Sequence, residues 1–146
     1  MINGIIITPL SIIDSVGGAV LHGMKSSDPG YSGFGEAYFS TVDPDAIKGW
    51  KRHRKMVLNL VVAVGSVRFI LLDDRQKSTT ANQFQEVVLS RERHYARLTV
   101  PPLVWVGFQG TDKEPSMLLN IANIKHSPDE VERKALNEIE YNWSKL

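Results

Sequence analysis

The segment IKGWKRHRKMVLNLVVAVGSVRFILLDDR, residues 47–75, joins a dense basic cluster to a long β-prone run. Residues 51–55 read Lys-Arg-His-Arg-Lys, and the aliphatic and β-branched residues of 56–64 and 67–74 predict two strands. Gly65-Ser66 between them predicts a hairpin turn, because glycine supplies the positive φ that such turns need. A chain with a formal net charge of only +1 thus gathers cationic side chains at the start of its core strands.

Short β-prone segments separated by turn residues continue on both sides of this segment. Further strands are predicted at residues 5–7, 17–25, 36–42, 84–90, 95–100 and 116–123. Many short strands at such spacing are typical of a sandwich or a small barrel. The tail alone looks helical: Ser127 is a candidate N-cap, Pro128 suits the first turn, and Asp129 and Glu130 favour the positive end of a helix dipole.

Composition limits the classes of protein that the chain can belong to. Its 146 residues are enough for one domain with a sizeable core, and we expect a single domain over residues 1–146. The near-neutral charge predicts no nucleic-acid partner. The absence of cysteine fits a reducing cytoplasm and excludes thiolate metal sites. No apolar run approaches the roughly 20 residues of a membrane span, so no membrane association is predicted.

The histidine pattern does not predict a metal site. A metal-binding β-barrel needs two histidines at i and i+2 on one strand, because alternation then puts both inside. The corresponding pair here is Lys51 and His53, and a protonated lysine is no ligand. We expect His22, His94 and His126 to be loop or surface residues. Phosphate-loop, dinucleotide and nucleophile-elbow motifs are also missing from the sequence, so we predict neither metal nor cofactor.

Three stretches carry a family resemblance: residues 34–53 (FGEAYFSTVDPDAIKGWKRH), 56–75 and 98–108 (LTVPPLVWVGF). They resemble the sugar-nucleotide cupins related to dTDP-4-dehydrorhamnose 3,5-epimerase, over about residues 17–141. The resemblance implies an all-β cupin fold, a double-stranded β-helix or jelly roll, here with a short C-terminal helix. It also implies a homodimer in which N-terminal strands pair across the interface, a role that the apolar strand at residues 5–7 suits.

The metal ligands of cupins are largely replaced in this sequence. Laid on the general cupin pattern, the two histidines fall on Lys51 and His53, the glutamate on Leu58 and the third histidine on Val106. Only His53 keeps a plausible ligand. The resemblance therefore implies a cupin that works without a metal ion, as the epimerases do.

The catalytic pair of the epimerases is replaced as well. Their general base falls on Lys51, their phosphate-binding arginine on Lys48, and their catalytic tyrosine on Leu119 or Asn120. A second related family, the dTDP-sugar 3,4-ketoisomerases, also lacks that tyrosine and has a Pro-x-x-x-Trp arrangement much like residues 101–105. The sequence lies between the two groups.

Isomerisation beside a ketone requires a base, a group that stabilises the enolate, and an acid. Lys51 and His53 have the same strand parity, so we expect both to point into the barrel as the catalytic residues. His53 titrates near neutrality and is one candidate base. Lys51 is the other, because desolvation and neighbouring cations lower the pKa of a lysine, or it remains charged and holds the enolate. The alternative is that the basic run is simply a solvated face.

Other side chains are candidates for contacts with the substrate. Tyr38 is a possible proton donor, Arg68 a phosphate ligand, and Trp105 either a stacking platform or a core residue. The predicted substrate-binding residues are Lys48, Tyr38, Asn59, Arg68, Trp105 and Asn120.

The predicted function is a metal-independent isomerase of a nucleotide-linked 4-keto sugar, a 3- or 5-epimerase in surface polysaccharide biosynthesis. Its partners are then a nucleotide-diphosphate sugar and a second copy of the chain. Two alternatives are a 3,4-ketoisomerase and a cupin that binds a nucleotide sugar without turning it over.

Overall fold

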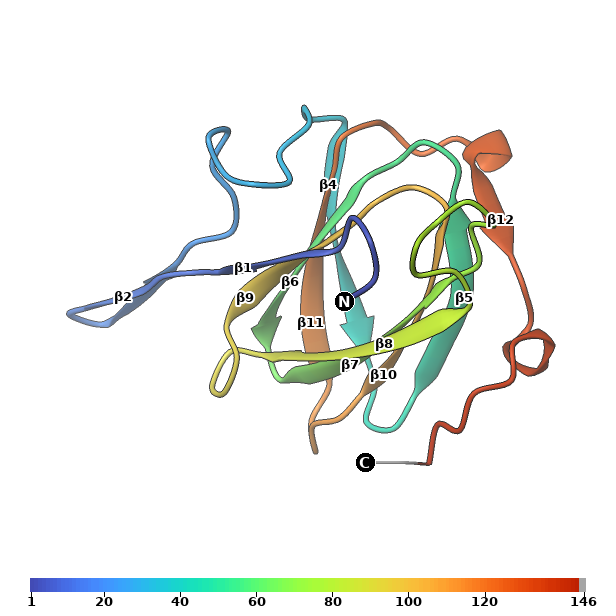
Figure 1. The fold of residues 1–146 in the computed structure, drawn as a ribbon. Coiled ribbons are helices and arrows are strands. Elements are labelled where there is room, and N and C mark those ends of the chain that lie inside the picture. The colour runs from blue at the N-terminus through green and yellow to red at the C-terminus, as the bar shows by residue number, and fades with distance from the viewer. Residues whose placement is uncertain (145–146) are drawn as a thin grey trace.

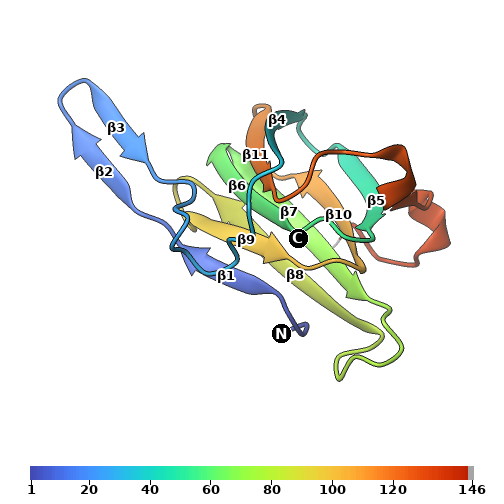
Figure 2. The ribbon, with the colours of Figure 1, turned by 90° about the horizontal axis from the view of Figure 1, so that it is seen from above.

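Two five-stranded antiparallel sheets face each other in the computed structural model, which describes residues 1–144 (Figures 1 and 2). The first sheet has the order β1 (Ile6–Pro9), β9 (Ala96–Val100), β6 (Leu58–Val64), β11 (Ser116–Ala122) and β4 (Glu36–Val42). The second has the order β12 (Val131–Arg133), β5 (Ile47–His53), β10 (Val104–Gly110), β7 (Ser66–Asp73) and β8 (Gln83–Ser90). This arrangement confirms the predicted all-β jelly roll.

The connection at Gly65 differs from its prediction. β6 pairs with β9 and β11, whereas β7 pairs with β8 and β10, so the two strands lie in different sheets and the predicted hairpin is wrong. Gly65 does have the expected positive φ of 76°, and a Cβ there would lie 2.3 Å from the Ser116 hydroxyl oxygen. The glycine therefore forms a tight corner that carries the chain from one sheet to the other.

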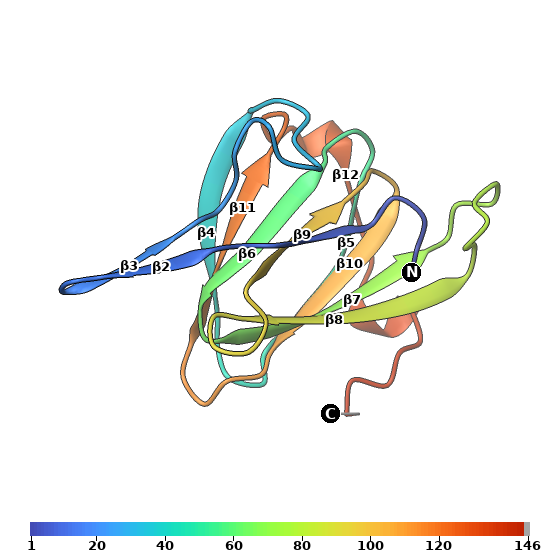
Figure 3. The same ribbon diagram turned by 60° about the vertical axis from the view of Figure 1, so that its left-hand side comes forward.

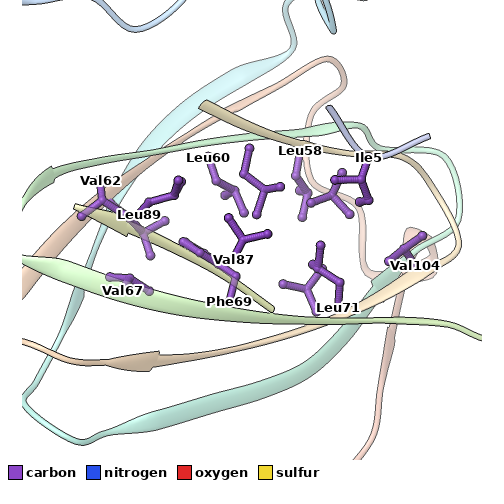
Figure 4. Close-up of a cluster of buried hydrophobic side chains, with 14 of the residues drawn as sticks. Ile5, Leu58, Leu60, Val62, Val67, Phe69, Leu71, Val87, Leu89 and Val104 are labelled. Carbon is purple, nitrogen blue, oxygen red and sulfur yellow. The ribbon is translucent and has the colours of Figure 1, made fainter. Parts of the chain in front are cut away.

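Alternating side chains of β6 and β7 fill the space between the sheets. Figure 4 shows them among the buried residues, and the two strands contribute Leu58, Leu60, Val62, Val67, Phe69 and Leu71. Val87 and Leu89 of β8 complete the core on the side away from β4. Each such side chain stabilises the fold by about 1.5–3 kcal/mol through burial. The apolar residues at every second position of β6 and β7 thus form one packed layer between the two sheets.

The C-terminal tail is not the predicted α-helix. It has two single 3₁₀ turns, Pro128–Glu130 and Leu136–Glu138, with strand β12 between them. The Ser127 side chain makes no capping hydrogen bond. A short isolated helix is marginal, and the tail gains more from pairing with β5 along the wall of the barrel (Figure 1). In residues 1–144 we find no helix with the length and apolar character to cross a membrane.

An N-terminal arm projects from the barrel. Strands β2 (Ile12–Ser15) and β3 (Gly18–Leu21) form a hairpin that extends well away from the two sheets (Figure 3). β1, which covers most of the strand predicted at residues 5–7, pairs with β9 of the same chain and forms one edge of the first sheet. The part of the arm that is left without a neighbouring sheet is therefore the hairpin.

A buried carboxylate fixes the loop between β7 and β8. Asp73 is fully buried and accepts hydrogen bonds from Arg75 Nε at 2.7 Å, Ser78 Oγ at 2.6 Å and Thr80 Oγ1 at 2.7 Å. The bonds from Arg75 above all, aided by the two hydroxyls, outweigh the effect of burial and hold the pKa of Asp73 well below its ordinary value of 3.8. The polar loop at residues 74–82 is thereby tied to the end of β7.

We expect Asp73→Asn to lower the free energy of unfolding at pH 7 by about 3 kcal/mol, because it leaves Arg75 without its partner. The pKa of Asp73 is lower in the folded than in the unfolded chain, so its contribution is complete above about pH 5 and is lost as the pH falls toward the folded pKa. Urea unfolding at several pH values should show a constant difference between the wild type and Asp73→Asn above about pH 5, and a difference that shrinks progressively as the pH falls below about 4. Asp14→Asn on the exposed hairpin is the control, and a pH-independent difference would contradict this account.

Candidate active site

A cavity of about 150 Å³ lies between β4, the edge strand of the first sheet, and β5 of the second. The structure brings five of the predicted site residues together on its wall: Tyr38, Lys48, Lys51, His53 and Asn120. Apolar side chains complete the wall, namely Leu58, Leu60, Val106, Phe108 and Leu118. The cavity is therefore an apolar pocket with a few converging polar groups, the usual form of a small-molecule site.

A bulge in β5 directs the side chains of Lys48 and Lys51 into the cavity. In the pairing of β10 with β5, Val106 lies opposite Lys51 and Phe108 opposite Lys48, so two steps on β10 match three on β5. Strict alternation would place Lys48 and Lys51 on opposite faces, whereas the extra residue turns both toward the cavity. Trp50 is directed to the outer face, where its ring centroid lies 5.3 Å from that of Trp143.

His53 is held by a buried glutamate from the tail. Its Nδ1 lies 2.7 Å from Glu130 Oε2, while Glu130 Oε1 accepts the backbone N–H groups of Lys55 and Met56, each at 2.9 Å. Burial alone would raise the pKa of Glu130, but the bonds from His53 and the two N–H groups outweigh it and lower that pKa. The ionised carboxylate only accepts, so Nδ1 of His53 carries a proton and Nε2 remains for the cavity.

Lys51 has an unusual electrostatic environment. Desolvation at the cavity wall, followed by the positive charges of Arg133 and Lys48, lowers the pKa of Lys51. Lys48 directs its ammonium group to the carbonyl oxygen of Thr41, 2.7 Å away. Lys51 is thus a better base than a surface lysine, and its protonated form puts a positive charge on the cavity wall.

Tyr38 and Asn120 form a hydrogen-bonded pair across the β4–β11 ladder. They lie directly opposite each other, and Asn120 Nδ2 donates to the Tyr38 hydroxyl at 3.0 Å. The phenol oxygen accepts this bond, which leaves its own proton available to the cavity. A phenol is therefore present beside the cavity, on β4 rather than on β11.

Three predicted substrate-binding residues lie outside the cavity. Asn59 is on the opposite face of the first sheet, where it accepts a hydrogen bond from Thr99 Oγ1 at 2.7 Å and donates to the Gly30 carbonyl at 3.2 Å. Its neighbours Leu58 and Leu60 face the cavity, so alternation turns Asn59 away. Asn59 therefore anchors the loop that precedes β4.

Arg68 and Trp105 lie on the outer face of the second sheet, beneath the C-terminal tail. Arg68 is buried and donates to Glu86 at 2.9 Å and to the Tyr141 hydroxyl at 3.1 Å. Trp105 Nε1 donates to Asp74 at 2.8 Å, and the ring belongs to an apolar cluster with Trp50. Both side chains hold the tail against the sheet, and Trp105 is buried in that apolar cluster.

The positions of the cupin metal ligands converge on this cavity. Lys51, His53, Leu58 and Val106 all line it, although they come from three strands. Leu58 and Val106 offer no ligand atom, so these residues do not fit a bound metal ion. Across residues 1–144, His, Asp and Glu side chains form no group of three or more that could hold one.

Comparison with solved structures places the chain in a family. It is 37% identical in sequence to a dTDP-sugar isomerase from Desulfovibrio desulfuricans, with a TM-score of 0.95 over 99% of this chain and 94% of that one. The chain belongs to the dTDP-sugar isomerase family. This finding confirms the resemblance to the sugar-nucleotide cupins.

More distant relatives of this dTDP-sugar isomerase family member share its fold. The dTDP-4-dehydrorhamnose 3,5-epimerase from Elizabethkingia anophelis is 14% identical, with a TM-score of 0.82 over 99% of this chain and 84% of that one. A sugar 3,4-ketoisomerase from Thermoanaerobacterium thermosaccharolyticum is 20% identical, with a TM-score of 0.74 over 92% and 90% of the two chains. At these identities the likeness concerns the fold alone.

A curated protein also matches part of the chain. A probable low-salt glycan biosynthesis epimerase from Haloferax volcanii is 28% identical over 85 residues, or 58% of this chain. The chain spans only about half of that protein, 54% of its length. No protein-family model matches the sequence.

Glu130 is the site residue of this family member that sequence reasoning missed. The sequence alone predicts that Glu130 lies in the first turn of a helix. Its hydrogen-bond partner His53 lies 77 residues earlier in the chain, and no local pattern connects the two. A buried carboxylate becomes recognisable only when the donors around it are brought together by the fold.

We expect nitrogen-15 NMR of this dTDP-sugar isomerase family member to show the proton of neutral His53 on Nδ1. Glu130→Gln should shift the Nδ1 signal strongly, because the charge-assisted bond is lost. Glu132→Gln is the matched control, since Glu132 pairs with Arg52 on the outer face and should leave His53 unchanged. An Nε2-protonated His53 would contradict the assignment.

Proposed function

We propose that this chain is an isomerase of a nucleotide-linked 4-keto sugar and inverts the configuration at C3 or C5. Membership in the dTDP-sugar isomerase family supports the reaction class. The single observation that carries the proposal is that His53, Lys51 and Tyr38 converge on one cavity from two facing sheets. These side chains can supply the base, the cation and the acid that enolisation beside a ketone requires.

His53 is proposed as the base. Its Nε2 takes the proton from the carbon beside the ketone. The electron pair of that C–H bond forms the C=C bond of the enolate, and the π electrons of the carbonyl group move to its oxygen. Glu130 fixes the tautomer and stabilises the imidazolium that results, as the carboxylate does in histidine-carboxylate pairs. Both residues are buried, so the pair keeps its geometry without solvent competition.

Lys51 and Tyr38 are proposed to complete the reaction. The Lys51 ammonium group stabilises the negative charge that develops on the carbonyl oxygen. The Tyr38 hydroxyl then returns a proton to the same carbon. The phenolate recovers a proton from solvent, and the His53 imidazolium releases its proton to solvent. Asn120 acts as a positioning residue, because it orients the Tyr38 hydroxyl at 3.0 Å.

The placement of acid and base favours epimerisation over the ketoisomerase alternative. His53 belongs to β5 of the second sheet and Tyr38 to β4 of the first, so they approach a sugar ring from opposite walls. Removal of a proton from one face and its return from the other inverts the carbon. A 3,4-ketoisomerase needs proton transfer between neighbouring carbons, which a single base can accomplish from one wall.

The size of the cavity suggests which part of the substrate it accepts. At about 150 Å³, it is smaller than the roughly 300–1,000 Å³ of pockets that enclose a drug-sized ligand. We propose that the keto sugar enters the cavity while the diphosphate stays at its cationic mouth. A role in surface polysaccharide or glycan synthesis and a cytoplasmic location are further parts of this proposal.

Incubation with dTDP-4-keto-6-deoxyglucose in deuterated water tests the proposal. We expect deuterium at C3 or C5 with inverted configuration, because the returned proton comes from an exchangeable phenol. His53→Ala should slow exchange by roughly a hundredfold or more and Tyr38→Phe should slow inversion more than proton removal. Arg91→Ala, a change of a partly exposed arginine on the β8–β9 loop, is the control.

Two other outcomes would replace the proposal. A ketone that moves to C3 identifies a ketoisomerase. No exchange together with tight binding identifies a cupin that binds the nucleotide sugar without turning it over. If His53→Ala and Lys51→Ala both leave exchange unchanged, the site is misplaced.

We also propose that the chain forms a homodimer through the β2–β3 hairpin. Ile13 and Val20 are cross-strand partners on one face of the hairpin and are 52% and 55% exposed, and Val16 at its tip is fully exposed. Exposed apolar side chains on a projecting arm are typical of a protein interface. A second copy would cover them.

We expect Ile13→Asp combined with Val20→Asp to convert a dimer into a monomer, because two charges would then be buried at the interface. Light scattering after size-exclusion chromatography measures the mass. Val88→Asp, which changes an exposed valine on the outer face of β8, should leave the mass unchanged. A wild-type monomer, or a double variant that stays dimeric, would contradict this interface.

A further inference from the structure

The tail brings another cation to the mouth of the cavity. β12 pairs with β5 so that Val131 lies opposite His53, Glu132 opposite Arg52 and Arg133 opposite Lys51. Directly opposed residues of an antiparallel pair share a face. Glu132 and Arg52 illustrate this on the outer face, where they form an ion pair of 2.6 Å. Because Lys51 lines the cavity, Arg133 is on the cavity side of β12.

Four buried or half-buried arginines elsewhere in the molecule have carboxylate partners. Arg52, Arg68, Arg75 and Arg97 each form an ion pair with an Asp or Glu within 3.0 Å. Among the residues that the structure describes, Lys48, Lys51 and Arg133 form no ion pair with a carboxylate. Three cations without a carboxylate partner are thus gathered along one edge of the cavity.

This arrangement costs stability when the site is empty. Like charges directly opposite each other across two strands are destabilising, and the repulsion between Arg133 and Lys51 is one of the causes that lower the pKa of Lys51. An anionic ligand between them would remove the repulsion. A diphosphate carries charge and acceptor oxygens on both sides, and a guanidinium binds phosphate in a bidentate manner.

We propose that Arg133 is a substrate-binding residue that grips the diphosphate of the nucleotide together with Lys48 and Lys51. The inference rests on the proposed function for the identity of the ligand. It adds a residue from the tail to the site, and it gives the three-residue strand β12 a binding role beside the orienting role of Glu130. The tail then supplies Glu130, which orients the base His53, and Arg133, which binds the phosphates.

Isothermal titration with thymidine diphosphate, pyrophosphate and thymidine tests this inference without turnover. Arg133→Ala should weaken binding of thymidine diphosphate about tenfold to a hundredfold, the usual effect of losing a charge-assisted contact. Pyrophosphate should weaken in parallel, and thymidine should not change. Arg133→Lys should retain part of the affinity. This result would show that the weaker binding of Arg133→Ala is not caused by unfolding.

Arg54→Ala is the matched control. Arg54 lies on the same strand end, but its ion pair is with Glu132 on the outer face, so its loss should change the dissociation constant by less than roughly threefold. Equal effects of Arg54→Ala and Arg133→Ala, or a wild type that binds thymidine diphosphate no better than thymidine, would overturn the inference.

The binding test and the exchange test fail independently. Loss of diphosphate binding in Arg133→Ala without any deuterium exchange by the wild type would support Arg133 and reject the isomerase proposal. Deuterium exchange together with an unchanged dissociation constant in Arg133→Ala would do the reverse.

Discussion

The buried carboxylate of Glu130 is the constraint on which the rest of the site depends. A carboxylate removed from water needs hydrogen-bond donors on both oxygens, and here one imidazole and two backbone N–H groups supply them. The same bonds orient His53, fix the start of β12 and set the register in which Arg133 meets Lys51. One side chain thus couples the tail of the chain to the chemistry of the cavity.

In this jelly roll the apolar core and the polar cavity occupy different parts of the space between the two sheets. The inner faces of β7 and β8 are filled with apolar side chains, while the space beside β4 and β5 stays open and receives polar groups from both sheets. The outer face of the second sheet holds paired cations and aromatic rings beneath the tail. The buried arginines that support the fold are therefore neutralised by nearby carboxylates, whereas Lys48 and Lys51 on the cavity wall are not.

Sequence reasoning succeeded wherever the signal was local. Alternation and β-branched residues located β4 and β6 to β9 to within a few residues, and shared parity placed Lys51 and His53 on one wall. It did not foresee the bulge that turns Lys48 and Lys51 to the same side, because alternation says nothing of an extra residue between them. It also failed for Arg68, whose partner Glu86 and the covering Tyr141 are 18 and 73 residues away along the chain.

By itself the sequence determined the strand content, the sign of φ at Gly65, the family, and the replacement of the metal ligands at Leu58 and Val106. These properties follow from side-chain chemistry and from interactions between residues close in the chain. The tertiary structure decided that Gly65 links two sheets and that the tail is a strand. It also decided that Glu130 forms a hydrogen bond with His53 and that Asn59 faces away from the cavity. Pairing in a jelly roll joins segments far apart in sequence, so these choices depend on burial and hydrogen bonding that exist only after the sheets have come together.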